Sequence, residues 1–163
     1  MKNTAYIFFV FVLLGQSCLS SDEPSIVCTP ETVAQQNSTI DDYIAQNNMP
    51  MQVTASGLRY SIDEAGTGDN VIYGDTIEVA YRGTLLDGSI FDQGTLGPPS
   101  FPFFQENSFI PGFEEGLLLL NEGAQATFIL PSELAYGCFP PQGSIINENE
   151  ILIFKVTMVS VNP

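Results

Sequence analysis

The sequence predicts an α+β fold, with a twisted antiparallel sheet curled over one short helix. Three observations lead to this fold class. Apolar and polar residues alternate in several stretches before position 82 and after position 124, as they do in half-buried strands. One helical pattern lies between these stretches, and glycine-rich turns separate the strands. A length of 163 residues suits one such domain with an appendage.

The first residues have the pattern of a signal peptide. Lys2 precedes an apolar run over residues 6–14 that is too short to span a bilayer, and small residues follow the run. Cys18 comes directly after them, which resembles a bacterial lipoprotein cleavage site where that cysteine becomes the lipidated N-terminus. We therefore expect residues 1–17 to be a signal peptide and Cys18 to carry a lipid. Plain secretion and an uncleaved anchor stay open as alternatives.

Residues 18–56 are expected to form a tether and a short helix. The stretch 19–37 is polar and contains two prolines, which suits a tether. Ser38 and Asp41 have the spacing of a capping box, and the apolar residues at positions 40, 43 and 44 share one helical face. The helix is therefore predicted to run from Ser38 to about Asn47.

The strands and the central helix follow from position 57 onward. Strands are predicted over 58–62, 77–81, 125–130 and 150–161, with a tight turn at Asp87-Gly88. Phe101 and Phe103 alternate around a proline, which predicts a short edge strand. A helix is predicted over 112–120. The 18-residue stretch 132–149, which contains AYGCFPPQGSII, is long for a loop in a compact domain, and such loops are usually functional.

Charge and composition exclude several classes of protein. Nineteen acidic residues face four basic ones, and a net charge of −15 repels nucleic-acid phosphates, so no nucleic-acid partner is expected. The chain has no histidine, which excludes the usual serine or cysteine triads, and its three cysteines are too dispersed for a zinc site. We expect no metal and no cofactor. Glu114 and Glu115 in the first turn of the central helix are interpreted as surface acids that the helix dipole favours.

Two cysteines lie beyond the signal region. Export would place Cys28 and Cys138 in an oxidising compartment, where a disulfide is permitted. Their spacing neither supports nor excludes a bond, so a disulfide and two unpaired thiols both stay open.

Four segments resemble the FKBP-type peptidyl-prolyl isomerases. They are YRGTLLDGSIFD (81–92), FIPGFEEGL (109–117), EGAQATFILPSELAYG (122–137) and ILIFKVTMVSV (151–161), and they occur in family order. The resemblance implies a domain over 57–163 with a five- or six-stranded antiparallel sheet around one short helix, preceded by an N-terminal helical extension. The short helix after a lipoprotein-like signal resembles the secreted bacterial members.

The resemblance also implies a site, in which a substrate proline enters an aromatic pocket between sheet and helix. The catalytic positions correspond to Tyr81, Phe91, Asp92 and Tyr136. The substrate-binding positions correspond to Phe101, Phe109, Ile110, Phe113, Ile146 and Phe154. Phe113 stands where the family often has a tryptophan at the pocket floor. We expect the Tyr136 hydroxyl to reach a substrate carbonyl. For Asp92 two roles stay open: it polarises the twisting carbonyl carbon, or it orients Tyr81 and Tyr136, and the orienting role is favoured. Phe139 and Ile146 are expected to shield the amide from water.

The implied activity is cis–trans isomerisation of X-Pro bonds during the folding of exported proteins. Its barrier of about 18–20 kcal/mol comes from amide resonance, and an apolar pocket lowers it by withdrawing water, so no acid or base is needed. The expected partners are proline-containing polypeptides and macrolides of the rapamycin class, at a lipid-anchored position in the periplasm or on the cell surface. Because Ile146 is followed by Asn147-Glu148-Asn149 instead of the family's I-P-P-N, the alternative is a catalytically weak proline-peptide binding module or holdase.

Overall fold

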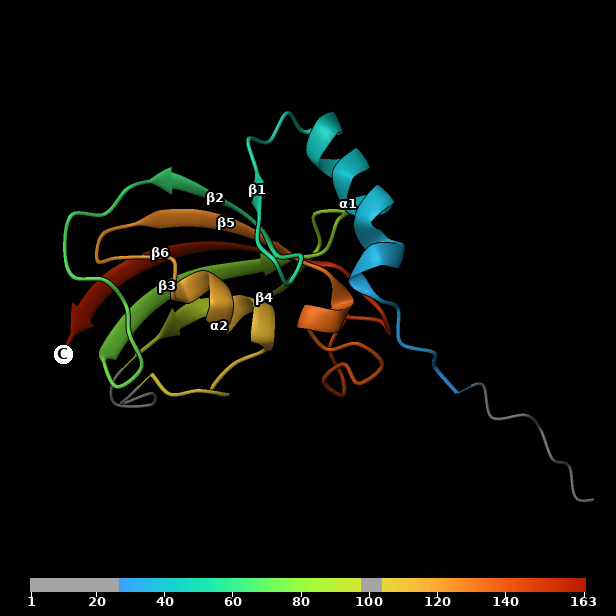
Figure 1. Cartoon of the computed structure of the whole chain (residues 1–163). Helices are drawn as coiled ribbons and strands as arrows, with labels where there is room; N and C mark the ends of the chain where they lie inside the picture. Colours follow the sequence, from blue (N-terminus) through green and yellow to red (C-terminus); the bar gives the residue numbers. More distant parts are fainter. Residues whose placement is uncertain (1–26, 98–103) are drawn as a thin grey trace, which may run out of the picture.

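Six strands form one antiparallel sheet, in the order β1-β2-β5-β6-β3-β4. The computed structural model describes residues 27–97 and 104–163. Figure 1 shows the elements along the chain: α1 (Val33–Gln46), β1 (Gln52–Val53), β2 (Arg59–Glu64), β3 (Thr76–Thr84), β4 (Ile90–Leu96), α2 (Pro111–Leu117), β5 (Gln125–Leu130), the 3-10 helix η1 (Ser132–Leu134) and β6 (Leu152–Asn162). The predicted α+β class and the predicted antiparallel sheet of five or six strands are confirmed, with six strands present in the described residues.

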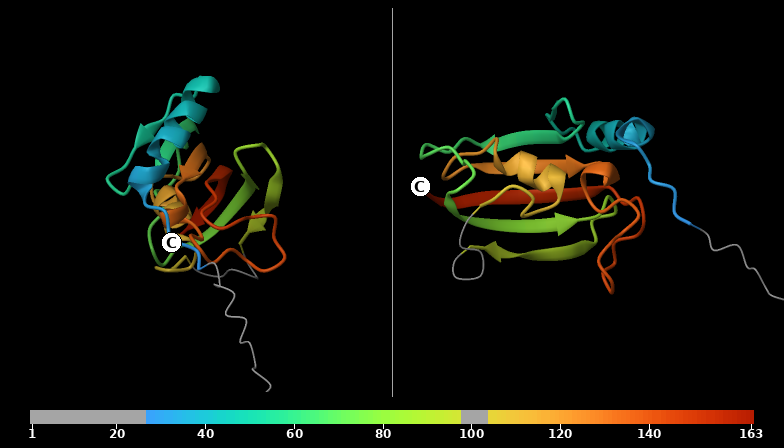
Figure 2. Two further views of the ribbon diagram at one scale, coloured as in Figure 1. Left: turned by 90° about the vertical axis from the view of Figure 1, so that its right-hand side faces the viewer. Right: turned by 60° about the horizontal axis from the view of Figure 1, so that its bottom comes forward.

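The main core lies between one face of the sheet and α2. Figure 2 (right) shows α2 lying across the sheet, over β5 and β6. Phe128 of β5 is the register partner of Phe154 of β6, and both side chains are buried in the cluster that includes Phe113 and Leu117 of α2. Each fully buried side chain of this size contributes about 1.5–3 kcal/mol of hydrophobic free energy.

Helix α1 covers part of the opposite face of the sheet. Ile129 and Ile153 follow Phe128 and Leu152 in their strands, so they point away from α2. They form a second buried cluster with Ile40 of α1 and with Ile151. Figure 1 shows α1 at the end of the sheet opposite the C-terminus.

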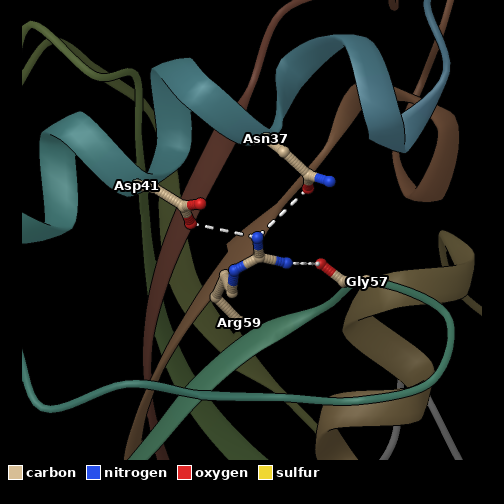
Figure 3. Close-up of polar contacts among 4 residues, drawn as sticks. All are labelled: Asn37, Asp41, Gly57 and Arg59. Atoms are coloured by element: carbon tan, nitrogen blue, oxygen red, sulfur yellow. Dashed lines mark hydrogen bonds and ion pairs between the residues drawn. The ribbon is translucent and has the colours of Figure 1, made fainter.

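Arg59, the first residue of β2, connects α1 to the sheet through hydrogen bonds (Figure 3). Its Nη1 donates to the Gly57 carbonyl at 2.9 Å, and its Nη2 donates to Asn37 Oδ1 at 3.1 Å and to Asp41 Oδ1 at 3.0 Å. Gly57 has a φ of +99°, and a Cβ at this position would lie 2.3 Å from Cγ1 of Val33. Only glycine therefore lets the chain turn this close to the helix.

The prediction for the start of α1 is wrong, because the helix begins at Val33 and not at Ser38. Gln35 Oε1 accepts from the Thr32 N–H at 2.8 Å and from the Thr32 hydroxyl at 2.9 Å, which closes the first turn. Glu133 Oε2 accepts from the Val33 N–H at 2.8 Å. This acceptor lies 100 residues away in the sequence, so a local capping pattern could not reveal it.

A disulfide joins Cys28 to Cys138, with Cα atoms 5.7 Å apart. The structure thereby decides between the two thiol states that the sequence left open. Residues 28–32 were predicted to be part of a tether, and the disulfide attaches Cys28 of this segment to Cys138 in the loop 132–149. Cys18 lies outside the described residues.

Most other predicted elements agree with the structure to within a few residues, and β5 matches its predicted range. β4 was not predicted. It lies at the edge of the sheet and most of its side chains are exposed, so its sequence carries little alternation. The two-residue β1 was also missed. The predicted edge strand at Phe101 and Phe103 lies outside the described residues.

Candidate functional site

An aromatic pocket opens where the sheet meets the start of α2. Its volume is about 540 Å³, and its lining consists of Tyr81, Phe91, Asp92, Leu96, Asn107, Ser108, Phe109, Ile110, Pro111, Phe113, Tyr136 and Phe154. Eight of the ten predicted pocket residues are in this lining. Of the other two, Phe101 lies outside the described residues and Ile146 is a buried core residue with 7% exposure.

Phe113 is the aromatic centre of the pocket. Its side chain is 3% exposed, and its ring centroid lies 4.7 Å from that of Phe154 and 5.5 Å from that of Phe109. The Phe109 contact is edge-to-face, and so is a further contact with Tyr81 at 6.1 Å. Offset and edge-to-face pairs are the favoured arrangements of aromatic rings, so the contacts fix the ring of Phe113.

A β-bulge brings Phe91 and Asp92 to the same pocket. Gly83 of β3 pairs with Asp92, but the next residue, Thr84, pairs with Ile90, so Phe91 is an extra residue in β4. Neighbouring residues in a regular strand point to opposite faces, and a bulge changes that direction. A Cβ on Gly83 would lie 2.3 Å from Cζ of Phe91, so the missing side chain at 83 makes room for the ring.

The polar part of the pocket is a tyrosine–aspartate pair. The Tyr81 hydroxyl donates to Asp92 Oδ2 at 2.7 Å, while Asp92 Oδ1 accepts from the Gln93 N–H at 2.8 Å. Burial, then the hydrogen bond and the charge of Asp92, raise the pKa of Tyr81 to about 12. The hydroxyl therefore stays protonated at physiological pH and serves as a hydrogen-bond donor.

Tyr136 is half-buried at the pocket and has a different environment. Burial, followed by the charge of Asp92, raises its pKa above the usual value of 10. Its hydroxyl makes no hydrogen bond with any residue of the described ranges. Asp92 therefore acts on Tyr81 by a hydrogen bond and on Tyr136 by its charge alone. The Tyr136 hydroxyl can reach a ligand.

The expected role of Phe139 as a shield for the amide is wrong. Phe139 is 86% exposed and is absent from the pocket lining. Its N–H donates to the Tyr136 carbonyl at 2.8 Å, which places it in a turn, and the preceding Cys138 is bonded to Cys28. The turn therefore directs the Phe139 ring into solvent.

Glu114 is a site residue that sequence reasoning missed, and its interpretation as a surface acid is wrong. The side chain is buried, with 7% exposure. Its carboxylate accepts from the backbone N–H groups of Asn107, Ser108 and Phe109 at 3.1, 3.0 and 3.3 Å, and from the Tyr73 hydroxyl at 2.8 Å. Glu114 thus holds the segment that forms one wall of the pocket.

The neighbouring Glu115 behaves as expected of a helix-surface acid. It is half-buried and accepts a single hydrogen bond, from Ser56 Oγ at 2.6 Å. The local sequence FEEG does not distinguish the two glutamates, because only the position of the 107–109 segment decides which carboxylate binds its N–H groups.

Within residues 27–97 and 104–163, no three Cys, Asp or Glu side chains are grouped so that they could hold a metal ion.

Known proteins are similar to this chain in sequence and in fold. The sequence profile of the family described as FKBP-type peptidyl-prolyl cis-trans isomerase matches residues 68–159. A Neisseria meningitidis protein named probable FKBP-type peptidyl-prolyl cis-trans isomerase FkpA is 42% identical over 113 residues, which are 68% of this chain and 40% of that protein. The Legionella longbeachae outer membrane protein MIP is 43% identical over 112 residues, 67% of this chain and 46% of that protein.

A solved structure gives the same result. The crystal structure of FkpA from Escherichia coli matches with a TM-score of 0.64 at 31% identity, over 80% of this chain and 61% of that one. This chain spans less than half of the length of the Neisseria and Legionella relatives. The family match nevertheless covers more than half of this chain, and it contains every residue that lines the pocket. On these grounds the chain belongs to the FKBP-type peptidyl-prolyl cis-trans isomerase family.

Proposed function

We propose that the chain catalyses cis–trans isomerisation of X-Pro bonds in exported polypeptides. The observation that carries the proposal is the pocket, whose lining is mostly aromatic and aliphatic. Asp92 is the only charged residue among its described lining, and its Oδ2 is already hydrogen-bonded to Tyr81. Such a cavity suits a proline ring with its flanking amides.

The pocket would lower the barrier by removing water from the amide. A planar amide carries partial charges on nitrogen and oxygen that water stabilises, and twisting the bond reduces this charge separation. The apolar rings around Phe113 favour the twisted form over the planar form more than water does. No proton transfer and no covalent intermediate is needed.

Two hydrogen-bond donors would hold the peptide on either side of the proline. The Tyr136 hydroxyl has no acceptor among the described residues, and the same holds for the Ile110 N–H at the start of α2. Each can donate to a substrate carbonyl. A macrolide of the rapamycin class, which presents a ring and flanking carbonyls of similar shape, is a second expected ligand.

A protease-coupled assay on a short proline peptide tests this function. Phe91→Ala removes a ring whose centroid lies 5.4 Å from that of Phe154. The lost contact of about 1.5–3 kcal/mol lowers kcat/KM by about ten- to a hundredfold. Phe139→Ala is the matched control, because that ring is exposed, and it should leave kcat/KM unchanged. Peptide binding by the wild type without turnover above background would instead identify the binding module or holdase.

We also propose export and attachment to a membrane through a lipid on Cys18. The pattern from Lys2 to Cys18 supports this, and a relative named outer membrane protein points to the cell envelope. None of the helices in the described ranges has the length and hydropathy to cross a bilayer. Radiolabelled fatty acid should enter the wild type and be absent from Cys18→Ser. Equal labelling of both would contradict attachment at this residue.

A further inference from the structure

We propose that residues 28–36, here called the N-terminal clasp, are a positioning part of the active site. They hold the loop 132–149, here called the site loop, which carries Tyr136. This inference rests on the proposed isomerase function, and it extends the site to a segment that the family match at 68–159 does not include. Four sets of contacts carry it.

Gln36 joins the two ends of the site loop. Its side chain is buried, with 3% exposure, although it belongs to a polar helix. Its Oε1 accepts from the Ser132 N–H at 2.7 Å, and its Nε2 donates to the Asn149 carbonyl at 2.7 Å. One amide thus satisfies a backbone donor at the start of the loop and a backbone acceptor at its end.

Asn149 forms the second set of contacts. Its side-chain Oδ1 accepts from the Glu31 N–H at 3.0 Å, and its Nδ2 donates to the Thr29 carbonyl at 2.9 Å. Its own N–H donates to the Gly137 carbonyl at 2.8 Å, directly after Tyr136. Asn149 has a φ of 58°, a conformation that asparagine tolerates better than most residues. The clasp is therefore connected to Tyr136 through Asn149 and Gly137.

A covalent bond and a further hydrogen bond complete the connection. The disulfide attaches Cys28 to Cys138, two residues after Tyr136. Glu133 accepts from the Val33 N–H at 2.8 Å, which fixes the other side of Tyr136 to the first turn of α1. The four sets of contacts are spread from residue 132 to residue 149, so they hold the loop at both ends and in its middle.

The clasp can position the loop only if the clasp itself is fixed. Figure 3 shows how Arg59 binds Asn37 and Asp41, the residues that follow Gln36 along α1. Ile40 of the same helix is fully buried against β5 and β6. The path from the sheet through α1 to the loop is therefore continuous and packed.

The site loop needs this support because it contains little regular structure of its own. After the one-turn η1, the loop is held internally mainly by backbone hydrogen bonds. One of them runs from the Gly137 N–H to the Ser132 carbonyl at 2.9 Å. A loop with few buried contacts opens at low free-energy cost. With the clasp removed, the Tyr136 hydroxyl would sample positions away from the substrate carbonyl.

Gln36→Leu tests the inference in the full chain with the disulfide formed. The variant keeps a helix-forming residue of similar size but leaves Ser132 N–H and Asn149 C=O without partners. We expect kcat/KM for a proline peptide to fall about tenfold, with most of the change in KM. Gln46→Leu changes an exposed glutamine in the same helix and serves as the matched control, with kcat/KM unchanged.

A double-mutant cycle separates positioning of Tyr136 from a general loss of stability. If the clasp acts through the Tyr136 hydroxyl, Gln36→Leu should matter little in a Tyr136→Phe background, because that hydroxyl is already gone. We expect it to lower kcat/KM by less than about twofold there. Equal losses in both backgrounds would overturn the inference, and so would no loss in either. Should Gln36→Leu fail to fold, Asn149→Gly takes its place. Glycine keeps the positive φ and removes the contacts with Thr29 and Glu31.

Amide hydrogen exchange tests the clasp even if the wild type shows no turnover. The Gly137 amide should exchange at least about tenfold faster in Gln36→Leu, and faster again after reduction of Cys28–Cys138, while the β5 amides keep their rates. Unchanged exchange at Gly137 in both states would show that the clasp does not hold the loop. Faster exchange together with no wild-type turnover would refute the isomerase proposal and leave the clasp in place.

Discussion

At the scale of single residues, the shape of the pocket depends on one ring, Phe113, surrounded by four others. Its neighbours are Tyr81, Phe109, Phe128 and Phe154. The ring is almost completely buried, but its residue also lines the pocket. A change at this position therefore acts on core packing and on ligand contact together.

Phe113→Trp should increase ligand affinity and decrease stability. A larger floor adds contact with a rapamycin-class macrolide, worth about 1 kcal/mol of binding free energy. The same extra atoms must fit among the four rings, which costs about 1–3 kcal/mol of folding stability. Calorimetry gives the affinity and thermal unfolding gives the stability. Weaker binding at unchanged melting temperature would contradict this account of the floor.

Glu114→Gln should weaken both the fold and peptide binding. An amide nitrogen cannot accept from the backbone N–H groups that the carboxylate binds, so buried donors lose their partners at a cost of about 2–4 kcal/mol. The pocket wall at 107–109 should loosen, and KM should rise. Glu115→Gln, one residue along α2, loses only a contact with Ser56 and should change stability by less than about 1 kcal/mol. Equal effects of the two substitutions would refute the assigned role of Glu114.

Residue-level prediction from the sequence worked where a motif fixed the position. Tyr81, Phe91 and Tyr136 lie in segments that resemble the family, and the structure places all three at the pocket. It failed where a contact depends on a distant segment. Gln36 looked like one polar residue among many, because its partners lie 96 and 113 residues away.

At the scale of elements, α1 is attached to the sheet by Arg59 and by Ile40. Arg59 Nη1 and Nη2 donate to three acceptors, two on α1 and one in the turn before β2, as Figure 3 shows. The ion pair with Asp41 is the more exposed part, since that side chain is 63% exposed. The hydrogen bonds to Gly57 and Asn37 should therefore contribute more to stability than the ion pair does.

Arg59→Lys and Asp41→Asn separate these contributions. A single ammonium cannot reach the three acceptors at once, so Arg59→Lys should cost about 1–2 kcal/mol. Asp41→Asn should cost less than about 1 kcal/mol, because the pair is partly exposed. Urea unfolding at constant m-value measures both. A larger loss from Asp41→Asn than from Arg59→Lys would show that the charge pair is what attaches α1.

Element-level prediction was accurate for strands with a buried face and poor for the others. The pattern at Ile77, Val79 and Tyr81 identifies β3 because one side of that strand faces the core. β4 has a single neighbouring strand and mostly exposed side chains, so its pairing with β3 leaves no periodic signal. The start of α1 was misplaced because a partner at Glu133 helps to fix it.

At the scale of the whole molecule, a strongly acidic chain carries a mostly apolar pocket. The net charge of −15 disfavours polyanionic partners but does not hinder the binding of an uncharged proline peptide.

The disulfide between Cys28 and Cys138 spans a sequence separation of 110 residues and joins the first described residues to the site loop. The sequence alone could not decide this bond, because the distance between two cysteines depends on the completed fold.

The pocket hydroxyls also set how the molecule responds to alkaline pH. Tyr81 has a folded-state pKa of about 12, above the unfolded value of 10. The stability that this shift contributes is fully present below pH 10 and is lost as the pH rises through 12. Neither Tyr81 nor Tyr136 loses its proton near neutrality, since both pKa values are raised, and the chain has no histidine.

The pH dependence of kcat/KM for a proline peptide tests the central claim, catalysis by an apolar pocket without proton transfer. The measurement runs from pH 6 to pH 9 on the wild type, with the uncatalysed rate subtracted and the fold checked at each pH. We expect turnover above background throughout, with kcat/KM constant to within about twofold, because no proton moves in the rate-limiting step. A bell-shaped profile, a tenfold change per pH unit, or no turnover at any pH would contradict it.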